Sequence, residues 1–247
     1  MKNYSLHQVV PVKDRAVAAA AVKICGLKDA IGLRAAVELG ASFLGLNFVE
    51  GSSRQISPAL AEKLVCALPQ PALCRLQHYN RDVALDGSAL ILTALFADAN
   101  DALRDEVVAM LGPCLGLIQL HGNETPERVA EIKARTGVPV MKAIALATAD
   151  DLEAIGDFEK VVDLFLFDAK INGKSGGTGK VFDWSLLKKV KTKTPWMLAG
   201  GLTPDNVAQA IAATGAKIVD VSSGVETKGQ KDIQKIRAFI RASAMDQ

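Results

Sequence analysis

Short apolar runs alternate along this chain with longer segments in which apolar residues recur at helical spacing. The apolar runs predict strands at Ala21–Cys25, Phe43–Phe48, Leu90–Ala97, Gly116–Leu120, Val140–Ile144, Leu164–Phe167, Trp196–Ala199 and Ile218–Val221. The helical spacing predicts helices at Asp29–Leu39, Pro58–Leu68, Asp101–Leu111, Pro126–Thr136 and Pro204–Ala213. Three of these helices would begin at a proline that follows a capping hydroxyl, at Ser57-Pro58, Thr125-Pro126 and Thr203-Pro204.

The predicted strands are apolar almost throughout, which is typical of a parallel sheet covered on both faces. Eight such strands alternating with helices in 247 residues fit an α/β fold, a single-domain (β/α)8 TIM barrel over residues 21–247. An open doubly wound sheet is the alternative, but no GxGxxG follows the first strand. Two segments have no place in the repeat. They are an N-terminal extension, 1–20, and an insertion before the third strand, Pro69–Ala89, which is polar around Gln77–Gly87.

Composition narrows the class of protein further. Apolar residues make up 49% of the chain and charged residues 23%, so we expect a large core and little disorder. The net charge of +2 gives no reason to expect a nucleic acid or a membrane as partner. Four widely spaced cysteines without a CxxC pair, and only three histidines, predict neither a metal site nor disulfides. No apolar run has the length of a membrane span or the profile of a signal peptide, so we expect a cytoplasmic protein.

Polar residues gather where the predicted strands end, which is where a barrel of this kind carries its chemistry. They are Cys25, Asn47, Arg54, Gln119, His121, Asp168, Gly200, Gly201, Asp220, Ser222, Ser223 and Gly224. Each has a structural alternative when taken singly: Cys25 as a small buried side chain, Asp168 or His121 as a turn residue, and Arg54 as a solvated charge. Their joint occurrence at strand ends favours a functional site.

The small residues after strands seven and eight have a more specific interpretation. Gly200-Gly201 and Ser222-Ser223-Gly224 would expose backbone N–H groups, and these two loops of a barrel often bind phosphate. Such a site needs no lysine, so a nearly neutral chain could bind a phosphorylated substrate. The alternative for Gly200-Gly201 is a tight turn without a ligand.

Several motifs in a fixed order resemble the phosphoribosylanthranilate isomerase family of tryptophan biosynthesis. The segments are Val22–Leu27, Arg54–Pro58, Gln119–Glu124, Asp168–Lys170, Gly176–Lys180, Phe182–Trp184, Ala199–Leu202 and Asp220–Glu226, and the likeness runs from about Val22 to Ile240. The resemblance implies a (β/α)8 barrel that needs no cofactor. It would convert N-(5-phosphoribosyl)anthranilate into 1-(2-carboxyphenylamino)-1-deoxyribulose 5-phosphate by an Amadori rearrangement.

The resemblance also implies a role for each site residue. Asp168 would be the general acid that opens the furanose ring, and Cys25 the general base that removes the neighbouring proton. Arg54 would bind the anthranilate carboxylate, although the run around it lacks the lysine and aromatic residue frequent in the family. Gln119, His121 and Asp220 would contact the substrate, and Gly200, Gly201, Ser222, Ser223 and Gly224 would bind its phosphate.

We also expect a protonated Asp168 and a mobile loop after it. Asp168 must hold a proton near neutral pH to act as an acid, and Phe165 and Phe167 beside it are compatible with the apolar surroundings that this requires. Lys174–Lys180 looks like a mobile lid that shields the reaction from water.

Two alternatives remain open at this point. The related indole-glycerol-phosphate synthase would place lysine and glutamate at strand ends, and Lys23 shares the face of Cys25. A barrel that keeps the phosphate loops without catalysis is the binding-protein alternative. It is disfavoured because both presumed proton-transfer residues are present. The oligomeric state is also open, with a homodimer as one possibility. Turnover of phosphoribosylanthranilate separates the two enzymes from each other and from a binding protein.

Overall fold

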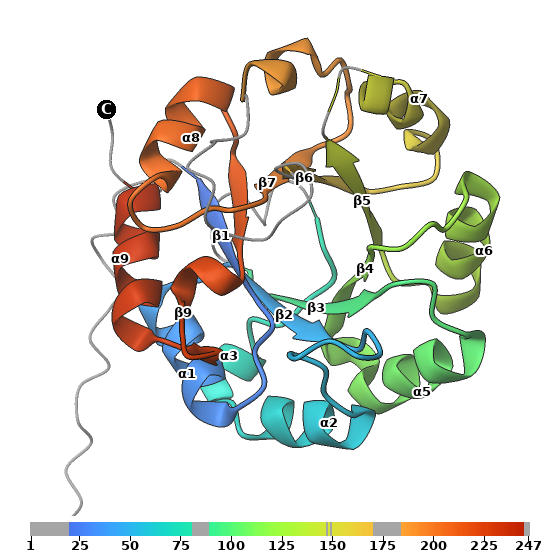
Figure 1. The fold of residues 1–247 in the computed structure, drawn as a ribbon. Helices are drawn as coiled ribbons and strands as arrows, with labels where there is room; N and C mark the ends of the chain where they lie inside the picture. Colours follow the sequence, from blue (N-terminus) through green and yellow to red (C-terminus); the bar gives the residue numbers. More distant parts are fainter. Residues whose placement is uncertain (1–19, 81–88, 147, 149, 170–183, 245–247) are drawn as a thin grey trace, which may run out of the picture.

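Eight parallel strands close into a barrel in the computed structural model of the chain (Figure 1). The structure describes residues 20–80, 89–146, 148, 150–169 and 184–244. The strands are β1 (Ala21–Cys25), β2 (Phe43–Asn47), β3 (Ile91–Phe96), β4 (Leu115–Leu120), β5 (Val140–Leu146), β6 (Leu164–Ala169), β7 (Trp196–Ala199) and β8 (Ile218–Val221). Each strand pairs with the next in sequence, and β8 returns to pair with β1, so the predicted (β/α)8 barrel is confirmed.

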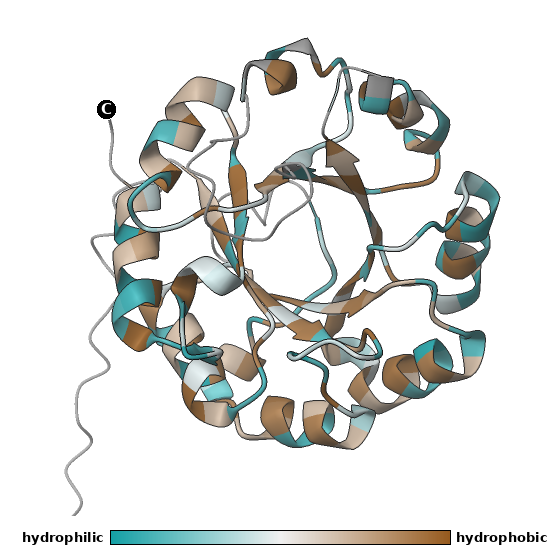
Figure 2. Cartoon of the chain, in the orientation of Figure 1, coloured by the Kyte–Doolittle hydropathy of each residue, from teal (hydrophilic) through white to brown (hydrophobic). Residues whose placement is uncertain are grey.

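Helices surround the barrel and bury their apolar faces against it (Figures 1 and 2). They are α1 (Ala30–Leu39), α2 (Pro58–Cys66), α3 (Gln70–Leu73), α5 (Asp101–Leu111), α6 (Pro126–Thr136), α7 (Ala154–Phe158), α8 (Val207–Thr214) and α9 (Ile233–Ser243). Short 3₁₀ helices occupy Gly112–Cys114, Asp150–Leu152, Trp184–Lys189 and Ser223–Val225, and a small hairpin pairs β9 (Glu226–Thr227) with β10 (Gln230–Lys231). Within the described ranges, no helix is both long and apolar enough to cross a membrane.

The predicted element boundaries agree with the structure except at α8. All eight predicted strands are present, each with its ends within two residues of the prediction. Ser57 and Thr125 cap α2 and α6 as expected, because each side chain accepts a hydrogen bond from a first-turn N–H. The predicted start of α8 at Thr203-Pro204 is wrong. Pro204–Asn206 is a turn, in which the Asn206 side chain accepts a hydrogen bond from the Thr203 N–H (2.8 Å), and the helix begins at Val207.

Alternate side chains of each strand build two apolar layers. On β1, Val22 and Ile24 pack in the layer between the barrel and the helices, whereas Lys23 and Cys25 point into the barrel. At the end where the strands begin, the interior of the barrel is filled by a separate apolar cluster. It includes Phe43, Ile91, Leu117, Met141, Leu164 and Ile218. Because most of these residues lie at or near the first residue of their strands, the polar residues at the other end are left as the accessible part of the interior.

Part of the predicted polar insertion is a packed segment of the barrel. Tyr79 is buried inside the barrel, its ring lies 6.3 Å from that of Phe43, and its N–H donates to the Gly116 carbonyl at 2.9 Å. Leu76 pairs with Leu90, so the segment runs beside the start of β3. The predicted insertion before β3 is therefore packed against the barrel as far as Tyr79, and residues 81–88 lie outside the described residues. The N-terminal residues 1–19 also lie outside them.

The close contact between this segment and β4 predicts a strong effect of one methyl group. A Cβ atom at Gly116 would overlap the Gln77 carbonyl oxygen, which is backbone and cannot turn away. We expect Gly116→Ala to lower the free energy of unfolding by about 1–3 kcal/mol. Gly156→Ala is the control. A Cβ atom at this exposed position in α7 meets nothing within 4 Å, so the substitution should stabilise the helix by about 0.5–1 kcal/mol. Urea unfolding of both variants measures the difference, and equal effects would contradict the proposed overlap.

Candidate active site

Cys25 ends β1 inside the mouth of the barrel and is 5% exposed. Gly45 faces it from β2 and leaves room for it, because a Cβ atom there would lie 2.9 Å from the Cys25 Cα and 3.0 Å from its Sγ. Two residues earlier on the same face, Lys23 is fully buried. Its Nζ donates to Asp220 Oδ1 on β8 at 2.8 Å. The candidate base thus stands directly beside a buried ion pair.

Burial and charge act on the Cys25 thiol in opposite directions. Burial raises the pKa of Cys25 above its ordinary value, the charge of Lys23 lowers it, and Asp220 raises it again. For Lys23, burial alone would lower the pKa, but the charges of Asp220 and Cys25 outweigh burial and raise it. Lys23 is therefore an ammonium ion at every pH of interest, whereas the protonation of Cys25 depends on what surrounds it.

Asp168 emerges at the end of β6 and faces His121, which follows β4. The His121 Nε2 lies 3.3 Å from Asp168 Oδ2, and the two side chains are 31% and 20% exposed. The other ring nitrogen, Nδ1, lies 3.0 Å from the Gln119 amide nitrogen. With the amide in this orientation Nδ1 accepts, so the ring proton sits on Nε2 and points at the carboxylate. Three predicted residues thus lie in one row, in which Gln119 is hydrogen-bonded to His121 and His121 lies 3.3 Å from Asp168.

The expected apolar surroundings of Asp168 are not supplied by the neighbouring phenylalanines. Phe165 and Phe167 point to the outer face of β6, where their rings stack at 5.7 Å and Phe167 meets Trp196 at 5.6 Å. Asp168 shares the inner face with Leu164 and Leu166 instead. The interpretation of the phenylalanines is therefore wrong, because neighbours in a strand lie on opposite faces of the sheet.

Arg54 lies in the loop after β2 and is held by a carboxylate from the loop after β8. Its Nε and Nη2 each donate to one oxygen of Glu226 at 2.7 Å, a bidentate pair. Gly26 provides space for the arginine stem, since a Cβ atom there would overlap the Arg54 Cδ. Glu226 also accepts from Lys231, whose side chain is 2% exposed, at 2.8 Å. Two cations and one anion leave this cluster with one net positive charge.

The loops after β7 and β8, which contain the predicted phosphate residues, lie against each other. Gly200 and Gly201 have φ values of 94° and 63°, a region that favours glycine. A Cβ atom at Gly224 would overlap the Leu202 carbonyl oxygen. Ser222 connects this region to the candidate base, because its hydroxyl donates to the Cys25 carbonyl at 3.1 Å. In the part of the chain that the structure describes, no protein hydrogen bond uses the N–H of Gly201, Ser223 or Gly224.

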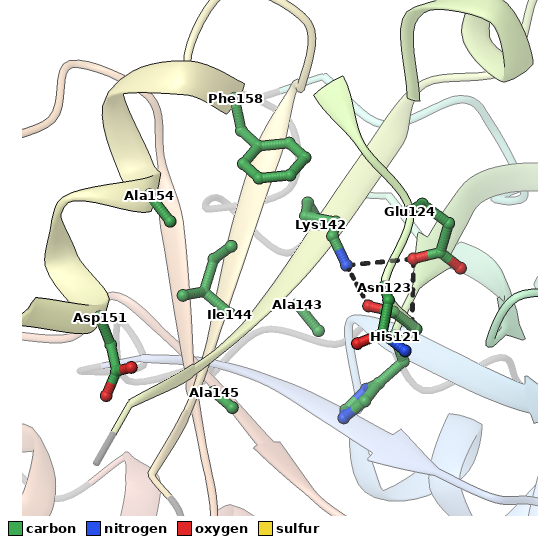
Figure 3. Close-up of a pocket in the computed structure, with 11 residues that line it drawn as sticks. His121, Asn123, Glu124, Lys142, Ala143, Ile144, Ala145, Asp151, Ala154 and Phe158 are labelled. Atoms are coloured by element: carbon green, nitrogen blue, oxygen red, sulfur yellow. Dashed lines mark hydrogen bonds and ion pairs between the residues drawn. The ribbon is translucent and has the colours of Figure 1, made fainter. Parts of the chain in front are cut away.

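A buried ion pair behind His121 holds the loop after β4 (Figure 3). Glu124 accepts from Lys142 Nζ at 3.1 Å and from the N–H groups of Gly122 and Asp98 at 3.1 and 2.9 Å. Lys142 also donates to the Gly122 carbonyl at 2.7 Å. A cavity of about 400 Å³ lies between this pair and α7. The loop that carries His121 is thus held in place by Glu124 and Lys142, which both bond to the backbone of Gly122.

Sequence reasoning left several of these charged residues without a role. The motifs contain Glu124 and Glu226 but predict no role for them, and no motif contains Lys142 or Lys231. A lysine inside an apolar strand was the available signal for Lys142. Glu226 and Lys231 are brought to Arg54 only by the fold. The expected lid, Lys174–Lys180, lies outside the described residues.

The site therefore combines a thiol, a carboxylate, a guanidinium and two small-residue loops at one end of a barrel. The family model described as N-(5'phosphoribosyl)anthranilate (PRA) isomerase matches residues 92–242. A curated N-(5'-phosphoribosyl)anthranilate isomerase of Paracoccus denitrificans is 46% identical over 231 residues, 92% of this chain and 98% of that protein. The chain belongs to the N-(5'-phosphoribosyl)anthranilate isomerase family. The resemblance inferred from the motifs is confirmed.

Other members of the isomerase family agree with this assignment. The relative from Rhodospirillum rubrum is 44% identical over 225 residues, 90% of this chain and 96% of its own. The solved isomerase of Thermotoga maritima superposes with a TM-score of 0.74 at 30% identity, covering 91% of this chain and 98% of that one. A further isomerase structure, with a TM-score of 0.70 at 28% identity over the same shares, is a complex with reduced 1-(o-carboxyphenylamino)-1-deoxyribulose 5-phosphate. These comparisons favour the isomerase over the synthase and the binding protein.

The Arg54–Glu226–Lys231 cluster predicts a pH-dependent contribution to stability. Burial alone would raise the pKa of Glu226, but the hydrogen bonds and charges of Arg54 and Lys231 lower it from 4.5 to about 2. The stabilisation is therefore complete above pH 4.5 and is lost as the pH falls towards about 2. At neutral pH we expect Glu226→Gln to lower the free energy of unfolding by roughly 1–3 kcal/mol, because two cations lose their anion.

Urea unfolding at a series of pH values measures this difference between the parent and Glu226→Gln. The difference should shrink as the pH is lowered below 4.5. Glu131→Gln is the control, since the Glu131 side chain is 57% exposed and pairs with Arg128 only at the surface. A difference between the parent and Glu226→Gln that stays constant or grows in acid would contradict the prediction.

Proposed function

We propose that this chain isomerises N-(5'-phosphoribosyl)anthranilate to 1-(2-carboxyphenylamino)-1-deoxyribulose 5-phosphate in tryptophan biosynthesis, with Asp168 as acid and Cys25 as base. The observation that carries the proposal is the placement of a carboxylate and a thiol on β6 and β1, both facing the mouth of one barrel. An Amadori rearrangement needs two groups of opposite protonation state at one sugar. Membership of the isomerase family supports the substrate.

In the first step Asp168 gives its proton to the furanose ring oxygen. The C1–O bond breaks, the anilino nitrogen forms a Schiff base with C1, and Asp168 becomes a carboxylate. His121, whose Nε2 lies 3.3 Å from that carboxylate, donates to it and stabilises the charge that appears. Gln119 keeps the histidine in the tautomer that can do this.

In the second step the Cys25 thiolate removes the proton from C2, and the electron pair moves through the Schiff base to the nitrogen. The product is an enolamine and a neutral thiol, and a further proton shift from oxygen to carbon gives the ketone. Gln119 and His121, whose side chains meet at 3.0 Å at the end of β4, are proposed to contact the substrate.

Arg54 is proposed to bind the anthranilate carboxylate through the end of its guanidinium group. Its Nε and one Nη2 proton already serve Glu226, so both protons of Nη1 and the second proton of Nη2 remain. The net charge of +1 in the cluster matches one carboxylate. Asp220 is proposed to face the substrate at the same end of the barrel, beside Cys25.

The phosphate is proposed to bind between Gly200-Gly201 and Ser222-Ser223-Gly224. The N–H groups of Gly201, Ser223 and Gly224, which make no protein hydrogen bond among the described residues, support this position in two loops that touch at Leu202 and Gly224. A cytoplasmic location and a homodimer complete the proposal. A solved relative described as monomers of the dimeric Thermotoga maritima isomerase supports the second.

Replacing Asp168 by asparagine tests the proposed function. The amide cannot protonate the ring oxygen, so we expect kcat to fall by about 10²–10⁴-fold while KM changes little. Turnover of freshly prepared phosphoribosylanthranilate is followed by the loss of anthranilate fluorescence. Asp205→Asn is the matched control, an exposed aspartate in the loop after β7, and should keep normal kcat. Normal kcat in a folded Asp168→Asn protein would remove Asp168 as the acid.

A pair of glycines tests the phosphate position. Gly201 and Gly215 have φ values of 63° and 72°, and a Cβ atom on either meets nothing within 4 Å. An alanine at either position therefore carries a similar backbone strain of about 1–2 kcal/mol. Only Gly201→Ala places its methyl group at the proposed phosphate, so KM should rise about tenfold in this variant alone. An equal KM for both variants would place the phosphate elsewhere.

A further inference from the structure

The thiol of Cys25 has to become an anion in a place that opposes anions. Its side chain is 5% exposed, and burial raises the pKa of the thiol. A thiol that stays protonated cannot accept a proton from carbon. The structure must therefore contain a positive charge that acts on this sulfur.

Four charged groups on four parts of the chain act on Cys25. Lys23 lies on β1, Asp220 on β8, Lys231 on β10 and Arg54 in the loop after β2. Lys231 and Arg54 share Glu226, which offsets one of their charges at a distance of 2.7–2.8 Å. Lys23 is the one of these cations that is fully buried inside the barrel, two residues before the thiol on the same strand face, and its positive charge lowers the pKa of that thiol.

We propose that the buried Lys23–Asp220 pair sets the charge state of Cys25, with Lys23 favouring the thiolate and Asp220 limiting that effect. The role of the thiolate as a base rests on the proposed function, whereas the effect of the ion pair on the charge of the thiol does not. Lys23 and Asp220 are positioning residues here, because they act through the sulfur. This assigns Asp220 a second role beside the substrate contact proposed above.

Geometry explains why both members of the pair are required. Asp220 is the partner of Lys23 in the β1–β8 ladder, so the 2.8 Å ion pair runs across the barrel wall. A lone buried ammonium ion is unfavourable, and a lone ammonium ion beside the thiolate would lower its basicity too far. The carboxylate reduces the field of the ammonium at the sulfur without removing it, because the charge of Lys23 acts on the thiol more strongly than that of Asp220. The sulfur therefore keeps the basicity that proton removal requires.

The test measures the thiol directly in the absence of substrate. In a background with Cys66, Cys74 and Cys114 replaced by serine, Cys25 is the only cysteine, and the ultraviolet absorbance of its thiolate is titrated with pH. Lys23→Met should raise the thiol pKa by about one unit or more, and Asp220→Asn should lower it. The double variant should lie between the parent and Lys23→Met. It also buries no unpaired charge, so it is expected to fold where a single variant does not.

Lys142→Met combined with Glu124→Gln is the matched control, because it removes another buried Lys–carboxylate pair from the same barrel. It should leave the thiol pKa unchanged. A thiol pKa that moves in the same direction in Lys23→Met and Asp220→Asn, or in neither, overturns the inference. If the thiol pKa values of the variants follow the predicted order but turnover does not follow the fraction of thiolate, the inference is supported and Cys25 is not the base. The failure of the inference and the failure of the proposed function are therefore distinguishable.

Discussion

The pairing of β8 with β1 is the constraint on which the site depends. This contact closes the sheet, and its register places Lys23 opposite Asp220. A shift by one residue would turn every side chain of β1 to the other face, so that Cys25 would point at the helices and Lys23 would be buried among aliphatic groups. The Lys23–Asp220 ion pair at 2.8 Å can form in this register only, so a shifted register of β1 against β8 would leave a buried charge without its partner. The closure of the fold and the placement of the base therefore have one physical origin.

Charge at the mouth of the barrel is arranged in neutral or nearly neutral units. Lys23 faces Asp220, Lys142 faces Glu124, and Glu226 serves both Arg54 and Lys231. Three of these pairs join different loops or strands, so each fixes the position of one element against the next. The Arg54–Glu226–Lys231 cluster is the one unit among these with a net positive charge, so it can supply local positive potential for an anionic substrate in a chain whose net charge is only +2. The overall charge of a protein says little about such a site.

The strands and the residues at their ends could be predicted because both depend on local pattern. Eight apolar runs fix the barrel, and in a barrel the ends of strands face one mouth. The start of α8 could not be predicted from Thr203-Pro204, because the Asn206 side chain accepts a hydrogen bond from the Thr203 N–H and Pro204–Asn206 forms a turn before the helix. The environment of Asp168 does not follow from its sequence neighbours, because Phe167 next to it points to the other face of β6. The role of Glu226 depends on a contact with Arg54 across 172 positions, which no local pattern contains.

The packing of Tyr79 inside the barrel determines by which end substrate enters and product leaves. The tyrosine and the apolar residues around it close the end where the strands begin, and the mouth at the other end carries the polar groups. As far as the described residues show, substrate and product therefore enter and leave by the same mouth of the barrel. A molecule of product that lingers there excludes the next substrate directly, so inhibition by product follows from the architecture as simple competition.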